Sequence, residues 1–180
     1  MHFARALTTV LIFGAGAAVV YAQESPPVET STKIGGKNIS IKYSAPSMRG
    51  RKIFGGAGAL QPDNSVWRAG ANSATALHTE ANLMFGGVAV PPGDYTLYVL
   101  LDPKGWKLIV SRQTGQWGIK RDGSTSLEES QVVGRIPMTM SKPPAPVETY
   151  KMTLSNTGGA TGKLQLEWEN VIASVNFTAK

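Results

Sequence analysis

From Lys33 onward, apolar and polar side chains alternate along the chain, and glycine or proline interrupts the alternation every few residues. In residues 38–43, for example, Ile39, Ile41 and Tyr43 would share one face. A period of two places successive side chains on opposite faces of a β-strand, whereas an α-helix requires a period near 3.6. After the first 22 residues no segment has a convincing amphipathic helical period. The alternation therefore predicts an all-β fold of about nine short antiparallel strands.

Turn signals separate these strands. Residues 102–105 read Asp-Pro-Lys-Gly, and proline is favoured at the second position of a type I turn. Residues 95–101 are apolar on both faces, which predicts a central strand covered on both sides. Residues 44–65 and 113–130 are predicted to be long loops. The pattern favours an antiparallel β-sandwich or jelly-roll over an open barrel. The predicted strands are residues 38–43, 74–78, 83–85, 88–90, 95–101, 106–112, 131–140, 147–154, 163–169 and 171–178.

The first 22 residues form a different kind of segment. His2 and Arg5 give a positive start, an apolar run follows from Ala6 to Val20, and small residues precede a cut after Ala22. This is the three-part pattern of a cleavable signal peptide. The run is also shorter than the roughly 20 apolar residues that a spanning helix needs. We therefore expect a periplasmic or extracellular protein with no membrane span after cleavage.

The remainder is long enough for one domain with a sizeable core. Residues 23–32 are polar and rich in proline, which predicts a disordered lead, and residues 33–180 are predicted to form a single β domain. The chain has no cysteine, which excludes disulfides, thiolate metal sites and cysteine nucleophiles. The formal net charge of +6 is spread along the chain, so we predict a solvated basic surface and no nucleic-acid partner.

Catalytic chemistry would depend on His78, the one histidine left after signal cleavage. The sequence contains no Gly-x-Ser-x-Gly motif of the kind that presents the nucleophile of a serine triad. His78 and Glu80 would share a strand face, and Asp63 or Asp94 could complete a metal site with them. A surface histidine beside a carboxylate is the favoured interpretation. We therefore predict no catalytic residue, no metal site and no cofactor.

The best candidate site combines arginine, asparagine and tryptophan side chains from loop-rich stretches. The planar fork of arginine suits carboxylate, sulfate or phosphate, and exposed tryptophans beside such donors are typical of sugar-binding surfaces. In the alternative interpretation Trp67 fills the core, Arg68 pairs with a buried carboxylate and Asn72 caps a turn. The candidate ligand-binding residues are Arg49, Arg51, Trp67, Arg68, Asn72 and Trp117.

Several segments, taken in order, carry a family resemblance. They are residues 33–37, 43–51, 66–72, 90–97, 114–118 and 166–170. The Trp-Arg-Ala-Gly-Ala-Asn segment followed by the Pro-Pro-Gly-Asp-Tyr hairpin is the most specific part. Together they resemble exported bacterial proteins of the domain of unknown function 2911 family, over residues 33–178. The resemblance implies a secreted or periplasmic β-domain and supplies no catalytic residues.

Three hypotheses for function follow, in order of preference. The first is a non-catalytic binding module for a sugar, peptide or anionic ligand. The second is a structural or interaction protein of the cell envelope, and the third is a hydrolase or metal-dependent enzyme that uses His78. The expected partner is thus a small molecule, glycan or peptide, and the sequence predicts no particular oligomeric state.

Overall fold

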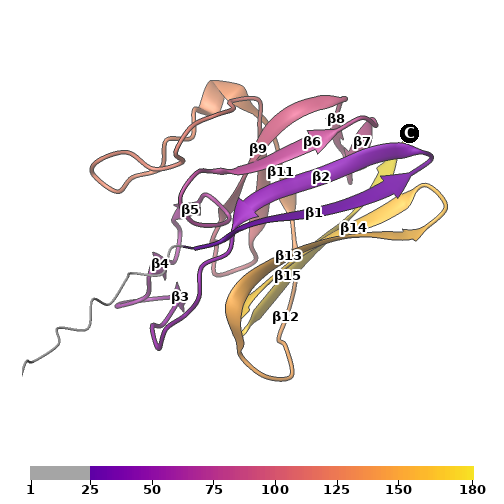
Figure 1. The fold of residues 1–180 in the computed structure, drawn as a ribbon. Helices are drawn as coiled ribbons and strands as arrows, with labels where there is room; N and C mark the ends of the chain where they lie inside the picture. Colours follow the sequence, from indigo (N-terminus) through magenta and orange to yellow (C-terminus); the bar gives the residue numbers. More distant parts are fainter. Residues whose placement is uncertain (1–24) are drawn as a thin grey trace, which may run out of the picture.

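A computed structural model describes residues 25–180, and the predicted signal peptide lies outside these residues. Two antiparallel sheets pack face to face (Figure 1). The first sheet has the order β1 (Pro27–Ile34), β2 (Lys37–Ser44), β6 (Thr75–Thr79), β9 (Gly93–Leu100), β10 (Lys107–Ser111) and β11 (Val132–Pro137), and β5 (Val66–Trp67) also pairs with β9. The second has the order β13 (Val147–Gly158), β14 (Thr161–Glu169), β15 (Val171–Ala179), β7 (Leu83–Phe85) and β8 (Val88–Val90), and β12 (Thr139–Ser141) also pairs with β15.

Outside the two sheets, regular structure is sparse. The strands β3 (Phe54–Gly55) and β4 (Gln61–Pro62) form a small parallel pair within the loop after β2. Within residues 25–180 the one helix is a 3-10 turn at Glu129–Gln131. The all-β, antiparallel prediction is therefore confirmed.

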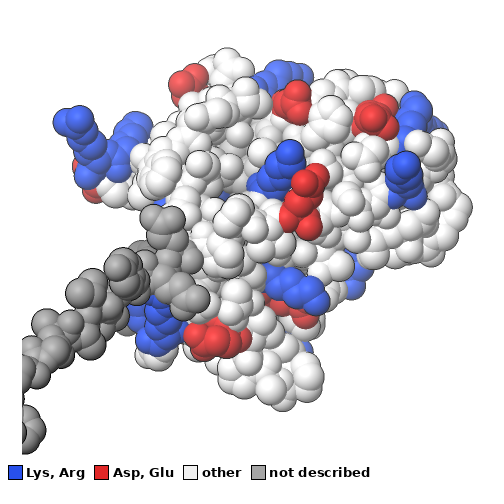
Figure 2. All heavy atoms as spheres, in the orientation of Figure 1, with Lys and Arg blue, Asp and Glu red and all other residues white. Residues whose placement is uncertain are grey.

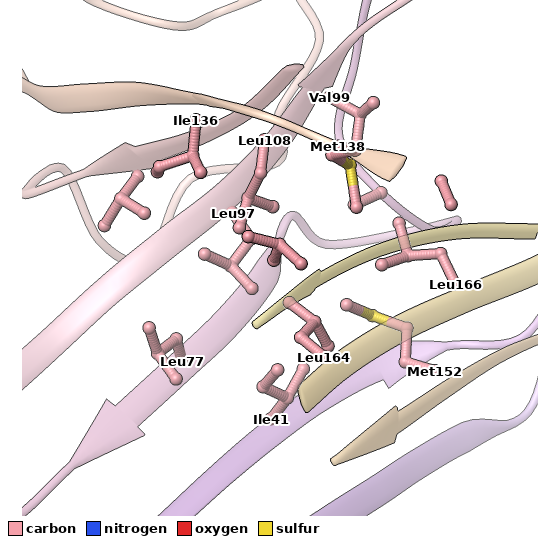
Figure 3. Packing of buried hydrophobic residues seen from close by; sticks show 14 of the residues in the cluster. Ile41, Leu77, Leu97, Val99, Leu108, Ile136, Met138, Met152, Leu164 and Leu166 are labelled. Atoms are coloured by element: carbon pink, nitrogen blue, oxygen red, sulfur yellow. The ribbon is translucent and has the colours of Figure 1, made fainter. Parts of the chain in front are cut away.

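The alternation in the sequence becomes the inner face of each sheet. Aliphatic side chains from both sheets meet in the middle (Figure 3), and most have no exposed surface or only a few per cent. The labelled residues of this core are Ile41, Leu77, Leu97, Val99, Leu108, Ile136, Met138, Met152, Leu164 and Leu166. At about 25 cal/mol per Å² of apolar surface, such burial is the dominant stabilising contribution in a chain without disulfides.

The prediction of a disordered lead over residues 23–32 is wrong from Pro27 onward. All eight residues of β1 pair in register with β2, from Pro27 opposite Ser44 to Ile34 opposite Lys37. Val28, Thr30 and Thr32 are half-buried and alternate with exposed side chains, so the segment has a period of two. Proline is compatible with this place because it is the first residue of an edge strand.

Both pairs of sheet edges lie close together, so the sandwich is closed at its sides. On one side the backbone N–H of Leu154 in β13 donates to Thr30 Oγ1 in β1 at 3.1 Å. On the other side Val88 of β8 packs directly against Gly134 of β11. The predicted strand over residues 131–140 is in fact two strands, because the chain passes from the first sheet to the second at the buried Met138.

The loop from residue 112 to residue 128 covers part of the outer face of the first sheet. Tyr98 and Ile109 point to that face and are nevertheless fully buried. Gln116 of the loop donates from Nε2 to the Tyr98 hydroxyl at 3.0 Å. This cover confirms that β9 is a central strand buried on both sides.

Charged residues are dispersed over the surface. Figure 2 shows basic and acidic side chains interspersed on one face, with no continuous basic patch there. No helix of residues 25–180 is long and apolar enough to cross a membrane.

Candidate functional site

The chain between β2 and β6 holds an unusual number of strained backbone positions. Arg49, Asn64, Ala69 and Asn72 have φ values of 50°, 62°, 53° and 57°. Residues other than glycine rarely adopt this left-handed region, and each instance costs on the order of 1–3 kcal/mol. Such strain persists only where surrounding contacts enforce it, and it is concentrated at ligand-binding and functional sites. This segment is therefore the first place to look for a site.

The strained positions are fixed by hydrogen bonds from distant parts of the chain. Asn72 Nδ2 donates to the Ser25 carbonyl at 3.3 Å, and the Asn64 N–H donates to the Leu101 carbonyl at 2.8 Å. The Arg49 N–H donates to Glu148 Oε1 at 2.9 Å. These hydrogen bonds thus fix the segment between β2 and β6 in one conformation relative to the sandwich.

Trp67 belongs to the core. It is 3% exposed, its ring stacks on Trp168 with centroids 5.8 Å apart, and its Nε1–H donates to the Gly70 carbonyl at 3.1 Å. Phe54 and Tyr150 also pack their rings against Trp67. Trp67 is therefore not an exposed side chain and fills the core, as the alternative interpretation has it, because β5 pairs with the central strand β9 and turns this side chain inward.

Arg68, the next residue, points to the surface and meets Trp117. Its Cζ atom lies 5.3 Å from the centroid of the Trp117 ring, and its Nη1 donates to the Trp117 carbonyl at 3.1 Å. Burial of the guanidinium lowers the pKa of Arg68 without a nearby carboxylate. Arg68 has no ion pair in the described part of the chain, so the alternative interpretation, in which it pairs with a buried carboxylate, does not hold there. Two predicted site residues 49 positions apart are therefore in contact.

Arg68 forms part of a cavity of about 470 Å³, which we call the arginine cleft. Its main side chains are Arg51, Leu60, Trp67, Arg68, Ile119 and Trp168. No aspartate or glutamate lines it. Arg51 is oriented by its own loop, because its Nε donates to the Met48 carbonyl at 3.0 Å and its Nη2 to the Ser47 carbonyl at 2.9 Å. The cleft therefore combines two positioned cations with an apolar floor.

The candidate residues separate into three groups. Arg51, Trp67 and Arg68 line the arginine cleft, and Trp117, which is 55% exposed, lies at its rim through its contact with Arg68. Arg49 and Asn72 do not line the cleft, and both take part in the hydrogen bonds that hold the loop. Sequence reasoning missed Leu60 and Ile119, which are isolated apolar residues within polar loops.

His78 is not part of this cleft. Its Nδ1 lies 2.7 Å from Asp94 Oδ1, and the two side chains are 48% and 73% exposed. Glu80 instead accepts a hydrogen bond from the Asn38 N–H at 2.6 Å. Among residues 25–180 there is no group of three histidine, aspartate or glutamate residues that could hold a metal ion. Ser40 lies beside His78 on the neighbouring strand, but no hydrogen bond joins the two side chains.

Comparison with known proteins gives a match to a family model but to no individual protein. No curated protein and no solved structure matches the chain significantly. A family model described as a protein of unknown function (DUF2911) matches residues 25–177, which is nearly the whole described chain. The segments of highest specificity in the sequence, around Arg68 and around Tyr95, lie inside this match. The chain therefore belongs to the DUF2911 family.

Proposed function

We propose that the protein is a non-catalytic binding module whose arginine cleft takes an anionic ligand. The observation that carries this proposal is the Arg68 guanidinium, which is stacked against Trp117 and anchored on its carbonyl at the cleft rim. A guanidinium has five N–H donors, and only one of those of Arg68 has an acceptor in the described residues. The remaining donors can bind carboxylate, sulfate or phosphate oxygens.

The surroundings of Arg68 support an anion rather than a neutral ligand. Arg51 contributes a second positive charge, and no carboxylate in the cleft wall competes for either arginine. Apolar walls from Trp67 and Leu60 lower the local polarity, which strengthens charge-assisted hydrogen bonds relative to water. A cleft of this size that combines positioned polar groups with apolar side chains has the usual form of a small-molecule site.

Pre-organisation is the physical advantage of this arrangement. Fixing a mobile arginine side chain costs about 2 kcal/mol of conformational entropy, and this cost weakens the binding of a ligand. Here the Trp117 ring, the Trp117 carbonyl and the close backbone of Gly118 already restrict Arg68. Acidic sugars suit both features, since their carboxylate or sulfate would meet the arginines and their C–H face would meet an indole ring.

The decisive experiment is a thermal-shift screen followed by calorimetry. The panel contains oligogalacturonate, a sulfated glycan fragment, inorganic phosphate, an acidic peptide and neutral sugars. A ligand at 100 times its dissociation constant adds about 2.7 kcal/mol, which raises the Tm of a domain of this size by several degrees. We expect an anionic member of the panel to give this shift.

Three variants locate the site. Arg68→Ala and Trp117→Ala should weaken anion binding at least tenfold while the variants remain folded. Arg112→Ala removes an exposed arginine that lines none of the described cavities and should bind as the parent protein does. If no anion binds, or if Arg68→Ala binds every anion as tightly as the parent, the proposal is wrong.

A second candidate function, docking of a partner protein, is favoured by one observation. Trp117 and Leu60 are exposed large apolar residues, at 55% and 43%. Leu60 lines the arginine cleft, and Trp117 contacts Arg68, which also lines it. Exposed apolar patches with a polar rim are typical of protein interfaces. Chemical cross-linking in cell-envelope extracts, compared between the parent and Trp117→Ala, separates this function from small-molecule binding.

We also propose that the protein works outside the cytoplasm. The support is the charged, apolar and small-residue pattern of the first 22 residues. N-terminal sequencing of the protein from periplasmic and culture-medium fractions tests it, and a mature chain that begins at Gln23 is the expected result. A chain that retains Met1 and stays with the cytoplasm would contradict the export proposal.

A further inference from the structure

A second cavity lies on the outer face of the first sheet, away from the arginine cleft. It has a volume of about 630 Å³, and we call it the His78 hollow. Its polar lining comes from Ser40 and Lys42 on β2, His78 on β6, Asp94 and Thr96 on β9, and Thr114 and Gln116 on the loop after β10. The strand register builds it: Ser40, His78 and Asp94 lie directly opposite one another on three adjacent strands.

The His78–Asp94 pair fixes one imidazole nitrogen and leaves the other available. Asp94 is an acceptor when ionised, so Nδ1 carries the proton in their 2.7 Å hydrogen bond. In the neutral imidazole Nε2 is then an acceptor, and no described residue donates to it. The hollow therefore presents the His78 Nε2 atom to a ligand, next to the Ser40 hydroxyl.

The opposite wall is held in place by the loop. Gln116 Nε2 donates to the Tyr98 hydroxyl at 3.0 Å and to the Gln113 carbonyl at 3.3 Å. The Gln116 carboxamide oxygen is buried and has no hydrogen-bond partner in the described residues. A buried acceptor of this kind costs about 1–3 kcal/mol.

Charges at the hollow are balanced, in contrast to the arginine cleft. Lys42 lies directly opposite Glu29 on β1, and His78 is bonded to Asp94. One lysine and one aspartate line the hollow, so its formal charges balance and do not favour an anion over a neutral ligand. Ala74 and Ala76 supply a small apolar area between the polar side chains, whereas the Leu77 side chain points into the core.

We propose that the His78 hollow binds the ring of a neutral saccharide. A sugar ring presents hydroxyls around its rim, each of which is both donor and acceptor, and an apolar C–H face. The hollow offers the matching set: hydroxyl donors, an imidazole and a carboxylate acceptor, an ammonium donor and a small apolar area. This site is independent of the anion proposed for the arginine cleft.

Calorimetric titration with glucose, galactose, N-acetylglucosamine, maltose and cellobiose tests the proposal on the purified protein. We expect at least one sugar to bind with a Kd in the millimolar range or tighter. His78→Ala and Lys42→Ala should each weaken that binding about fivefold or more, since each removes one or more hydrogen bonds to the ligand. Lys151→Ala, an exposed lysine on the outer face of the other sheet, is the matched control and should change nothing.

The outcomes separate this site from the arginine cleft. Sugar binding that is lost in His78→Ala but kept in Arg68→Ala supports the hollow. Sugar binding that is kept in the His78→Ala, Lys42→Ala double variant overturns it, as does binding that Arg68→Ala alone abolishes. The absence of binding for every sugar of the panel also overturns it. Circular dichroism of each variant establishes that loss of binding is not loss of fold.

Discussion

At the scale of single residues, the position of the loop that follows β10 depends on a glycine at residue 118. Gly118 has a φ of 94°, and a Cβ atom built on it would lie 2.8 Å from Arg68 Cβ and 3.1 Å from Ala74 Cβ. Glycine is therefore what lets the Trp117 loop lie against Arg68. The cation–π contact at the cleft rim follows from this close approach as much as from the arginine and tryptophan themselves.

Gly118→Ala should destabilise the protein and weaken anion binding. The added methyl meets Arg68 and also forces alanine into a left-handed conformation, so we expect a loss of about 2–4 kcal/mol. Gly115→Ala is the matched control, because its φ is 79° but its Cβ would meet no atom within 4 Å. Urea denaturation should show a loss of about 1 kcal/mol for the control. Equal losses in the two variants would show that only backbone strain matters.

Two buried tyrosines differ in whether the hydroxyl has a partner. The Tyr150 hydroxyl is buried without a hydrogen bond in the described residues, whereas the Tyr43 hydroxyl accepts from the Met152 N–H at 3.0 Å. Tyr150→Phe should therefore leave stability at pH 7 nearly unchanged or raise it slightly. Tyr43→Phe leaves a buried N–H unpaired and should cost about 1–3 kcal/mol. Thermal denaturation of both variants measures the difference, and an equal loss would contradict the assignment.

The same tyrosines predict a sensitivity to alkali. Burial raises the pKa of Tyr43 above its usual value of 10.0 and raises the pKa of Tyr150 well above it. The folded state therefore keeps protons that the unfolded state releases above pH 10, and stability falls as the pH rises from there. Tyr150→Phe should make the urea midpoint fall less steeply between pH 10 and 12. If the urea midpoints of the parent and the variant fall equally steeply over this pH range, the explanation is wrong.

At the scale of elements, the strands were predictable and their partners were not. The predicted segments 83–85, 88–90 and 163–169 coincide with β7, β8 and most of β14, because turn residues bracket clean alternations. Residues 27–34 alternate as well, but most of their side chains are polar, and the segment begins at the Pro26-Pro27 pair. The crossing at Met138 was missed because a strand that changes sheets keeps its alternation.

The candidate site was predictable only in part, for the same reason. Arginine and tryptophan are chemically conspicuous, so Arg68 and Trp117 could be singled out from residue type alone. Whether Trp67 faces the core or the solvent depends on the pairing of β5 with β9, which brings together residues more than 30 positions apart. The His78–Asp94 contact likewise arises from the register between β6 and β9.

The contact between β8 and β11 gives a prediction at this scale. A Cβ on Gly134 would lie 2.5 Å from Val88 Cγ1, so the two sheet edges approach through the absence of a side chain. Gly134→Ala should cost about 1–3 kcal/mol by overpacking, and Val88→Ala in the same chain should recover part of it. Gly87→Ala, whose Cβ would meet no atom within 4 Å, is the control. Additive losses in the urea-denaturation cycle would show that the two edges do not touch.

At the scale of the whole molecule, stability depends on closing the sandwich without a covalent link. The chain has no cysteine, so the edges are held by side-chain packing and a few hydrogen bonds. One side depends on β1, where Thr30 accepts from the Leu154 N–H and the Lys33 carbonyl accepts from Asn156 Nδ2 at 3.1 Å. Beneath β1, the strand β2 has buried apolar residues and a full set of backbone groups paired to β1.

Removing β1 should therefore expose β2 as a long open edge. An unprotected edge with apolar side chains pairs readily with another chain, so a protein that begins at Gly35 should self-associate or unfold. A protein that begins at Gln23 keeps β1 and is the control. Size-exclusion chromatography with light scattering over a range of concentrations compares the two. We expect the shorter protein to form larger species as concentration rises, with a Tm at least 10 °C lower. In a domain of this size 1 kcal/mol shifts Tm by about 2–4 °C, and the loss of a whole strand costs far more than 1 kcal/mol. A shorter protein that elutes and melts as the control does would show that β1 is an accessory strand and that β2 alone closes this side of the sandwich.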